Sequence, residues 1–204
     1  MQFVILLIIV VLVFIALYIK ASNLNGSSQS SSPMILLASF LSNKNENVVA
    51  DVNLYLNSAK DYFEKHEDNL FQRGIESAEQ VTPAVVLIDA LLSHDKVVYQ
   101  DHRAKPSEVL EMLNTLSEGK LEHAKGYAEL FEHYNNTRFG IGAFLDTTSS
   151  APSIFDCIQS TGLKLLSIDE GSDSYALILI EGNELERFIS VANEAEIRIN
   201  FKEK

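Results

Sequence analysis

The stretch that decides the fold is LLSIDEGSDSYALILI, residues 165–180. Two apolar runs flank the loop DEGSDS, whose Asp, Gly and Ser residues are typical of turns. This pattern predicts an antiparallel hairpin in which residues 163–168 pair with residues 174–180. Because the loop lacks the alternating oxygen ligands and the distant glutamate of an EF-hand calcium site, its composition favours a plain turn.

Outward from the hairpin, helical and strand periodicities alternate along the chain. Helices are expected over residues 34–41, 47–71, 83–94, 106–119, 121–134, 154–162 and 183–194. Further strands are expected at VVYQD, residues 97–101, and at EIRINF, residues 196–201. Together these segments predict an α+β fold, with a mixed sheet of about four strands packed with helices.

In this mixed sheet, the strand ending at Asp101 is predicted to run parallel to the strand ending at Asp169. The carboxyl ends of both strands then meet at one edge, where open sheets commonly bind ligands. This reasoning gives a candidate ligand-binding rim of five residues: Tyr99, Asp101, His102, Asp169 and Asp173. A histidine between carboxylates suits a proton relay or a cation site. The alternative is a solvated edge of polar strand ends with no ligand.

Motifs for metals, cofactors and catalysis are missing from the sequence. The five histidines show no metal-ligand spacing, and FGIGAF, residues 139–144, lacks the third glycine of a dinucleotide-binding loop. No P-loop, nucleophile elbow or Cys-His pair is present, and the single cysteine excludes an intramolecular disulfide. We therefore predict no metal and no cofactor, while whether the chain is an enzyme stays open.

The charge of the chain limits its partners. There are 28 acidic against 16 basic residues, which gives a formal net charge of −12. Such a surface repels a phosphate backbone, so nucleic acid is not an expected partner. A basic protein is the expected partner, because opposite charge accelerates encounter.

The first residues of the chain form its most apolar segment. FVILLIIVVLVFIALYI, residues 3–19, has no polar group except the Tyr18 hydroxyl, and as a helix it reaches the short end of a bilayer span. We predict a transmembrane anchor over residues 1–20, a serine-rich linker over 21–32 and one globular domain over 33–204. A cleaved signal peptide is the rival interpretation. Lys20, on the C-terminal side of the span, favours a cytoplasmic domain.

Two segments resemble a known family. LIDALLSHDKVVYQDHRAKPSEVLEMLNTL, residues 87–116, and LKLLSIDEGSDSYALILI, residues 163–180, are similar to a bacterial family described as domain of unknown function 6630. The resemblance rests on the Tyr99-x-Asp101 strand end, the helix opened by Pro106 and the Asp-x-Gly-Ser-Asp hairpin loop. It implies a fold and a bacterial source, and no activity.

Two functional hypotheses follow. In the first, the chain is a membrane-tethered acidic domain that binds another protein, as an adaptor or an immunity-type inhibitor does. In the second, it is a small-molecule hydrolase or ligand-binding domain that uses the carboxylate and histidine rim. A shaped pocket at the rim would favour the second hypothesis, and a flat acidic face would favour the first.

Overall fold

The structure is a computed structural model that describes residues 32–145 and 153–201. The chain divides into two units, Met1–Ser32 and Pro33–Lys204. All helices and strands below belong to the second unit.

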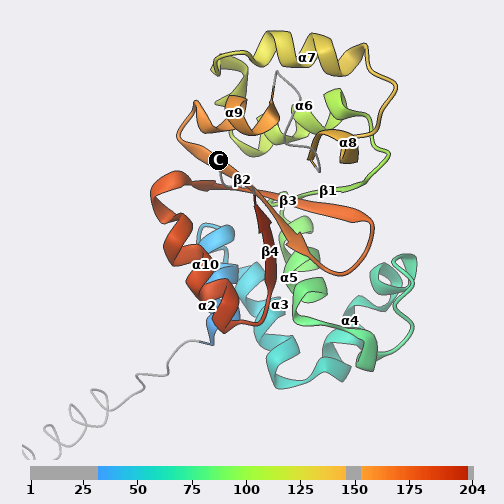
Figure 1. The fold of residues 1–204 in the computed structure, drawn as a ribbon. Coiled ribbons are helices and arrows are strands. Elements are labelled where there is room, and N and C mark those ends of the chain that lie inside the picture. Colours follow the sequence, from blue (N-terminus) through green and yellow to red (C-terminus); the bar gives the residue numbers. More distant parts are fainter. Residues whose placement is uncertain (1–31, 146–152, 202–204) are drawn as a thin grey trace, which may run out of the picture. The chain divides into compact units, whose positions relative to one another are not determined.

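The described elements follow the predicted alternation of helices and strands (Figure 1). Before the hairpin these are α2 Pro33–Leu41, α3 Glu46–Asn57, α4 Ala59–Gln72, η1 Ala78–Gln80, α5 Pro83–Leu92, β1 Val98–Asp101, α6 Pro106–Leu116, η2 Leu121–His123, α7 Tyr127–Asn135, α8 Gly142–Leu145 and α9 Ile154–Gln159. From the hairpin onward they are β2 Leu163–Asp169, β3 Ser174–Glu181, η3 Gly182–Glu184, α10 Leu185–Glu194 and β4 Arg198–Phe201.

The β2–β3 hairpin forms as the sequence predicts. The strands are antiparallel, with Leu163 opposite Glu181 and Ile168 opposite Ala176. The sheet has the order β1-β3-β2-β4, so the hairpin supplies its two central strands. The apolar residues on both strands are explained by this position, since a central strand covered on both faces has no solvated side.

The prediction of a mixed sheet is wrong, because every strand pairing in the described sheet is antiparallel. β1 and β2 do run in the same direction, but β3 lies between them. The physical reason is that β3, the second strand of the hairpin, occupies the edge of β2 that faces β1. β1 therefore forms its hydrogen bonds with β3 instead of β2. Both strands nevertheless end at the same edge, because Asp101 pairs with Ser174, the first residue of β3.

Helices cover both faces of the sheet and enclose two apolar clusters (Figure 1). On one face, α2, α3, α4, α5 and α10 pack against inward-facing residues such as Ile168 and Ile178. On the other face, α6, α7, α8 and α9 pack against residues such as Leu165 and Leu177. The apolar α5 is central as predicted. It begins at Pro83 and is capped by Thr82, whose Oγ1 accepts from the Val85 N–H at 3.3 Å.

Two long predicted helices are each divided in the structure. The helix expected over 47–71 is interrupted at Ser58, which adopts an extended conformation and caps α4 by accepting from the Asp61 N–H at 3.1 Å. The helix expected over 121–134 is replaced by η2 and α7, which meet at Gly126 with φ of 85°. In both places the apolar periodicity continues across the break, so periodicity alone could not locate it.

The predicted transmembrane segment at residues 3–19 and the linker up to residue 31 lie outside the described residues. Within 32–145 and 153–201, no helix has the length and apolar character needed to cross a bilayer. The first described helix, α2, packs on the domain, where Met34, Leu37 and Ala38 are buried.

Candidate functional site

Three of the predicted rim residues meet where β1 ends and β3 begins. His102 Nδ1 lies 3.5 Å from Asp101 Oδ1 and 3.4 Å from Asp173 Oδ2. One ligand atom from each residue can be chosen so that all three lie within 4.8 Å of one another. The antiparallel pairing of β1 with β3 causes this meeting, because it brings the end of β1 beside the hairpin loop.

An open cavity of about 410 Å³ adjoins this cluster. Its walls come from the ends of β2 and β4, the hairpin loop, the start of β3 and His102. The lining residues are His102, Ser167, Ile168, Asp169, Ser172, Asp173, Ser174, Tyr175 and Asn200. Of the predicted rim residues, His102, Asp169 and Asp173 therefore line the cavity, whereas Asp101 and Tyr99 do not.

One hydrogen bond to the His102 ring indicates its tautomer. Arg103 Nε donates to His102 Nε2 at 3.2 Å, so Nε2 is the acceptor and a neutral ring carries its proton on Nδ1. Nδ1 is buried and has no hydrogen-bond partner among the described residues. Nδ1 therefore lies near two carboxylates, at 3.5 Å and 3.4 Å, and is hydrogen-bonded to neither.

The segment FGIGAF packs against the backbone of His102, which explains its first glycine, Gly140. The Gly142 N–H donates to the His102 carbonyl at 3.0 Å, and the Ile141 N–H donates to the Ala104 carbonyl at 2.9 Å. A Cβ on Gly140 would lie 2.4 Å from the His102 carbonyl oxygen. Glycine is thus required at residue 140 by close packing of two backbones.

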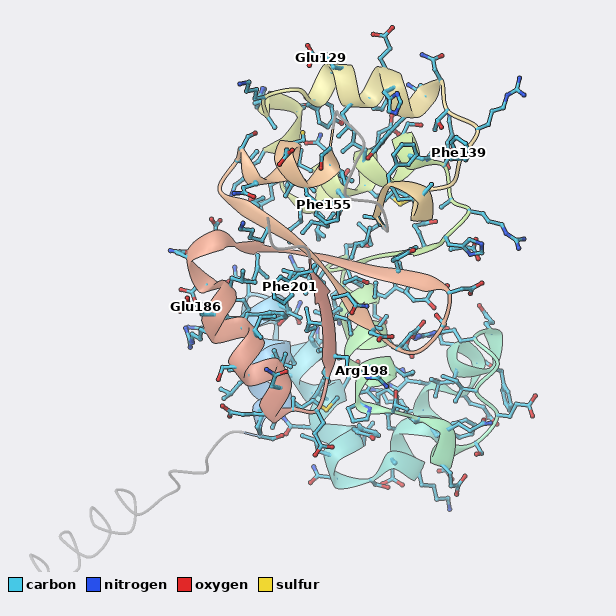
Figure 2. All side chains as sticks on the ribbon, viewed as in Figure 1. Glu129, Phe139, Phe155, Glu186, Arg198 and Phe201 are labelled. Carbon is cyan, nitrogen blue, oxygen red and sulfur yellow. The ribbon has the colours of Figure 1, made fainter. Side chains whose placement is uncertain are left out.

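The other two predicted rim residues have different surroundings. Asp169 Oδ1 accepts from the Gly171 N–H at 2.8 Å, and its Oδ2 lies 3.9 Å from Arg198 Nη1 of β4, a residue labelled in Figure 2. Tyr99 turns away from the cavity, because its hydroxyl donates to Glu170. The structure therefore brings Asp101, His102 and Asp173 together, keeps Asp169 at the cavity wall and separates Tyr99 from them.

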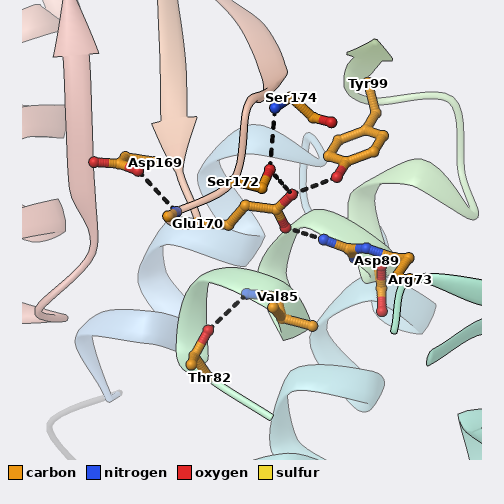
Figure 3. Close-up of polar contacts among 10 residues, drawn as sticks. Arg73, Thr82, Val85, Asp89, Tyr99, Asp169, Glu170, Ser172 and Ser174 are labelled. Atoms are coloured by element: carbon orange, nitrogen blue, oxygen red, sulfur yellow. Dashed lines mark hydrogen bonds and ion pairs between the residues drawn. The ribbon is translucent and has the colours of Figure 1, made fainter. Parts of the chain in front are cut away.

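A buried polar cluster lies beneath the hairpin loop (Figure 3). Arg73, at the end of α4, pairs through one terminal nitrogen with Asp89 of α5 and through the other with Glu170 of the loop. The guanidinium also lies over the Tyr99 ring, 5.0 Å from its centroid. One arginine thus joins two helices, the hairpin loop and β1.

Asp89 is only partly compensated within this cluster. Burial raises the pKa of Asp89 above its ordinary value, although Arg73 acts in the opposite direction. Its Oδ2 atom is buried without a hydrogen-bond partner among the described residues. The cluster therefore depends on Arg73, which faces two buried carboxylates at once.

Sequence reasoning missed Arg73, Asp89 and Glu170. Asp89 could have been identified, because it is the single carboxylate in the apolar helix PAVVLIDALL. A buried acid needs a polar or charged partner. No sequence pattern indicated the roles of Arg73 and Glu170. Glu170 lies between Asp169 and Gly171 in a turn, where a carboxylate is ordinarily solvated.

Comparison with known proteins establishes the class of this domain. The family model described as Domain of unknown function (DUF6630) matches residues 33–202, which is most of the chain. The chain belongs to this family, and the match begins well before the two segments that carried the resemblance in the sequence. No curated protein and no solved structure shows significant similarity to it.

Proposed function

We propose that this domain is a protein-binding module whose rim accepts a basic segment of a partner protein. The observation that carries the proposal is the pair of carboxylates on either side of His102. The side chains of Asp101 and Asp173 are 55% and 75% exposed. Within the described ranges, neither forms an ion pair with a lysine or arginine of this chain.

A cationic side chain from a partner would relieve the repulsion between these two carboxylates. An arginine guanidinium can donate to both, and the adjoining polar cavity leaves room for the residues that flank it. The net charge of −12 would attract a basic partner from a distance, which raises the association rate more than the final affinity. The cavity beside the rim is open rather than enclosed, and the Asp101 and Asp173 side chains are more than half exposed. This exposure fits a binding surface better than the water-excluding pocket that the hydrolase hypothesis requires.

Binding of a hexa-arginine peptide to the full chain tests this proposal. We expect Asp101→Asn and Asp173→Asn each to weaken binding by about threefold to fivefold at low salt, because each removes one exposed charge pair. The double variant should lose most of the binding measured by isothermal titration calorimetry. Affinity should also fall as salt increases.

The matched control is Glu186→Gln, which removes the same charge from α10, far from the rim (Figure 2). If this variant weakened peptide binding as much as Asp173→Asn does, binding would follow net charge alone and the rim would have no special role.

A divalent cation is a second candidate ligand, and the ligand distances favour it. A tetrahedral metal with bonds of about 2.1 Å holds its ligand atoms roughly 3.4 Å apart, close to the separations of His102 Nδ1 from the two carboxylates. The bond from Arg103 to Nε2 opposes it, because Nδ1 must lose its proton to bind a metal. Titration with Zn²⁺ alone separates the candidates: binding that His102→Ala abolishes would favour the metal over the peptide.

We further propose that residues 3–19 anchor the domain to a membrane, with the serine-rich linker as a flexible tether. The support is the sequence of this segment, which has no polar group except the Tyr18 hydroxyl and as a helix reaches the short end of a bilayer span. In cell fractionation, the full chain should sediment with membranes and resist extraction by high salt, whereas the chain shortened to residues 33–204 should stay in the supernatant. Full-length chain in the supernatant would contradict the anchor.

A further inference from the structure

Glu170 has an unusual position for a residue in a hairpin loop. It follows the rim residue Asp169, yet its side chain points inward and is only 6% exposed (Figure 3). Its carboxylate accepts hydrogen bonds from Arg73, from the Tyr99 hydroxyl and, at 2.9 Å, from the Ser172 hydroxyl. Carboxylates are rarely buried without such partners.

These contacts attach the loop to parts of the fold that are held independently. Arg73 ends α4 and is also bound to Asp89 of the central helix α5, while Tyr99 belongs to β1. Among the described residues, the hydrogen bonds within the loop itself are short-range, such as that from the Ser174 N–H to Ser172 Oγ at 3.1 Å. Bonds of this kind are common in turns and do not fix a loop relative to the rest of the fold.

We infer that Glu170 is the positioning residue of the rim, and that its bonds to Arg73 and Tyr99 hold the loop so that Asp173 faces His102. Asp173 lies three residues after Glu170, so releasing Glu170 lets the Asp173 carboxylate move away from the ring. The effect on peptide binding rests on the proposed function, whereas the effect on the loop does not.

The first test measures hydrogen exchange in the loop, residues 169–174, of the ligand-free full chain. Glu170→Gln keeps the shape of the side chain and removes its charge, so the ion pair with Arg73 is lost and the bond from the Tyr99 hydroxyl becomes one between neutral groups. We expect the loop amides to exchange about tenfold faster. The control is Glu181→Gln at the opposite end of the hairpin, where an exposed ion pair with Lys120 is lost and the loop should not respond.

The second test measures hexa-arginine binding to the same variants. Glu170→Gln should weaken binding by about threefold to tenfold, because a smaller fraction of the loops then has Asp173 in place. Should Glu170→Gln fail to fold, Tyr99→Phe serves instead, since it removes one anchor and keeps the ion pair with Arg73. A smaller acceleration of exchange is expected for it.

The outcomes separate the two proposals. Unchanged loop exchange in folded Glu170→Gln overturns the positioning role. Faster exchange in a chain that never binds the peptide supports the positioning role and defeats the proposed function. Equal effects of Glu170→Gln and Glu181→Gln on the loop would also overturn it, because any loss of charge would then suffice.

Discussion

Replacing Arg73 with methionine should lower the free energy of unfolding by about 3–5 kcal/mol, the cost of breaking a buried ion pair by removing one partner. The substitution leaves Asp89 and Glu170 buried without their shared counter-charge. It also removes the cation above the Tyr99 ring. Urea unfolding of the full chain in mild detergent, followed by circular dichroism because the chain has no tryptophan, measures the change.

Arg187→Met is the matched control for this substitution. Arg187 is 73% exposed and lies 3.4 Å from Glu184, so the loss of this surface pair should change stability by less than about 1 kcal/mol. The triple variant Arg73→Met, Asp89→Asn, Glu170→Gln should recover part of the stability lost by Arg73→Met, because no uncompensated charge then stays buried. Equal losses for Arg73→Met and Arg187→Met would show that burial of the cluster contributes nothing.

Gly140→Ala should be the most disruptive small substitution beside the rim, with a loss of about 1–3 kcal/mol, as expected for overpacking. The new Cβ would lie 2.4 Å from the His102 carbonyl oxygen and 2.5 Å from Arg103 Cα. Both neighbours are backbone atoms, so no side-chain rotation relieves the contact. The displaced His102 should also weaken hexa-arginine binding in the same calorimetric assay.

Gly142→Ala tests whether this effect comes from the close contact. A Cβ there meets Tyr175 Oη at 3.2 Å, and His102 Cβ and the His102 carbonyl oxygen at 3.3 Å, so every contact is much longer than the 2.4 Å and 2.5 Å backbone contacts at residue 140. The residue also opens α8, where alanine has the better helix propensity. We expect a loss well below that of Gly140→Ala, and a loss of equal size would contradict the backbone clash as the cause.

Local sequence patterns predicted those features that depend on neighbouring residues. The β2–β3 hairpin followed from two apolar runs around a turn, and α5 followed from Thr82 and Pro83 at its start. The same reasoning missed the break at Ser58, because the apolar periodicity continues past it. It also wrongly predicted a mixed sheet. The residues within a strand do not indicate which other strand will pair with it.

The rim was predicted in part, for a similar reason. The common direction of β1 and β2 was foreseen, and it places Asp101, His102 and Asp173 at one edge. The direction in which a side chain turns was not foreseen, since Tyr99 points into the buried cluster and Asp169 bonds to its own loop. Tyr99 takes its orientation in a cluster with Glu170 and Arg73, and these two residues are 97 positions apart in the sequence.

By itself, the sequence determined the α+β class, the acidic surface, the hairpin and the family, because composition, turn chemistry and apolar periodicity act over a few residues. The tertiary structure alone decided that β3 separates β1 from β2 and that Gly140 must be a glycine against the backbone of His102. It alone decided that one loop carboxylate, Glu170, is buried while Asp173 stays exposed. Such features depend on contacts between residues far apart in the chain, and the free energy of burying a charge is set by the partner that folding brings to it.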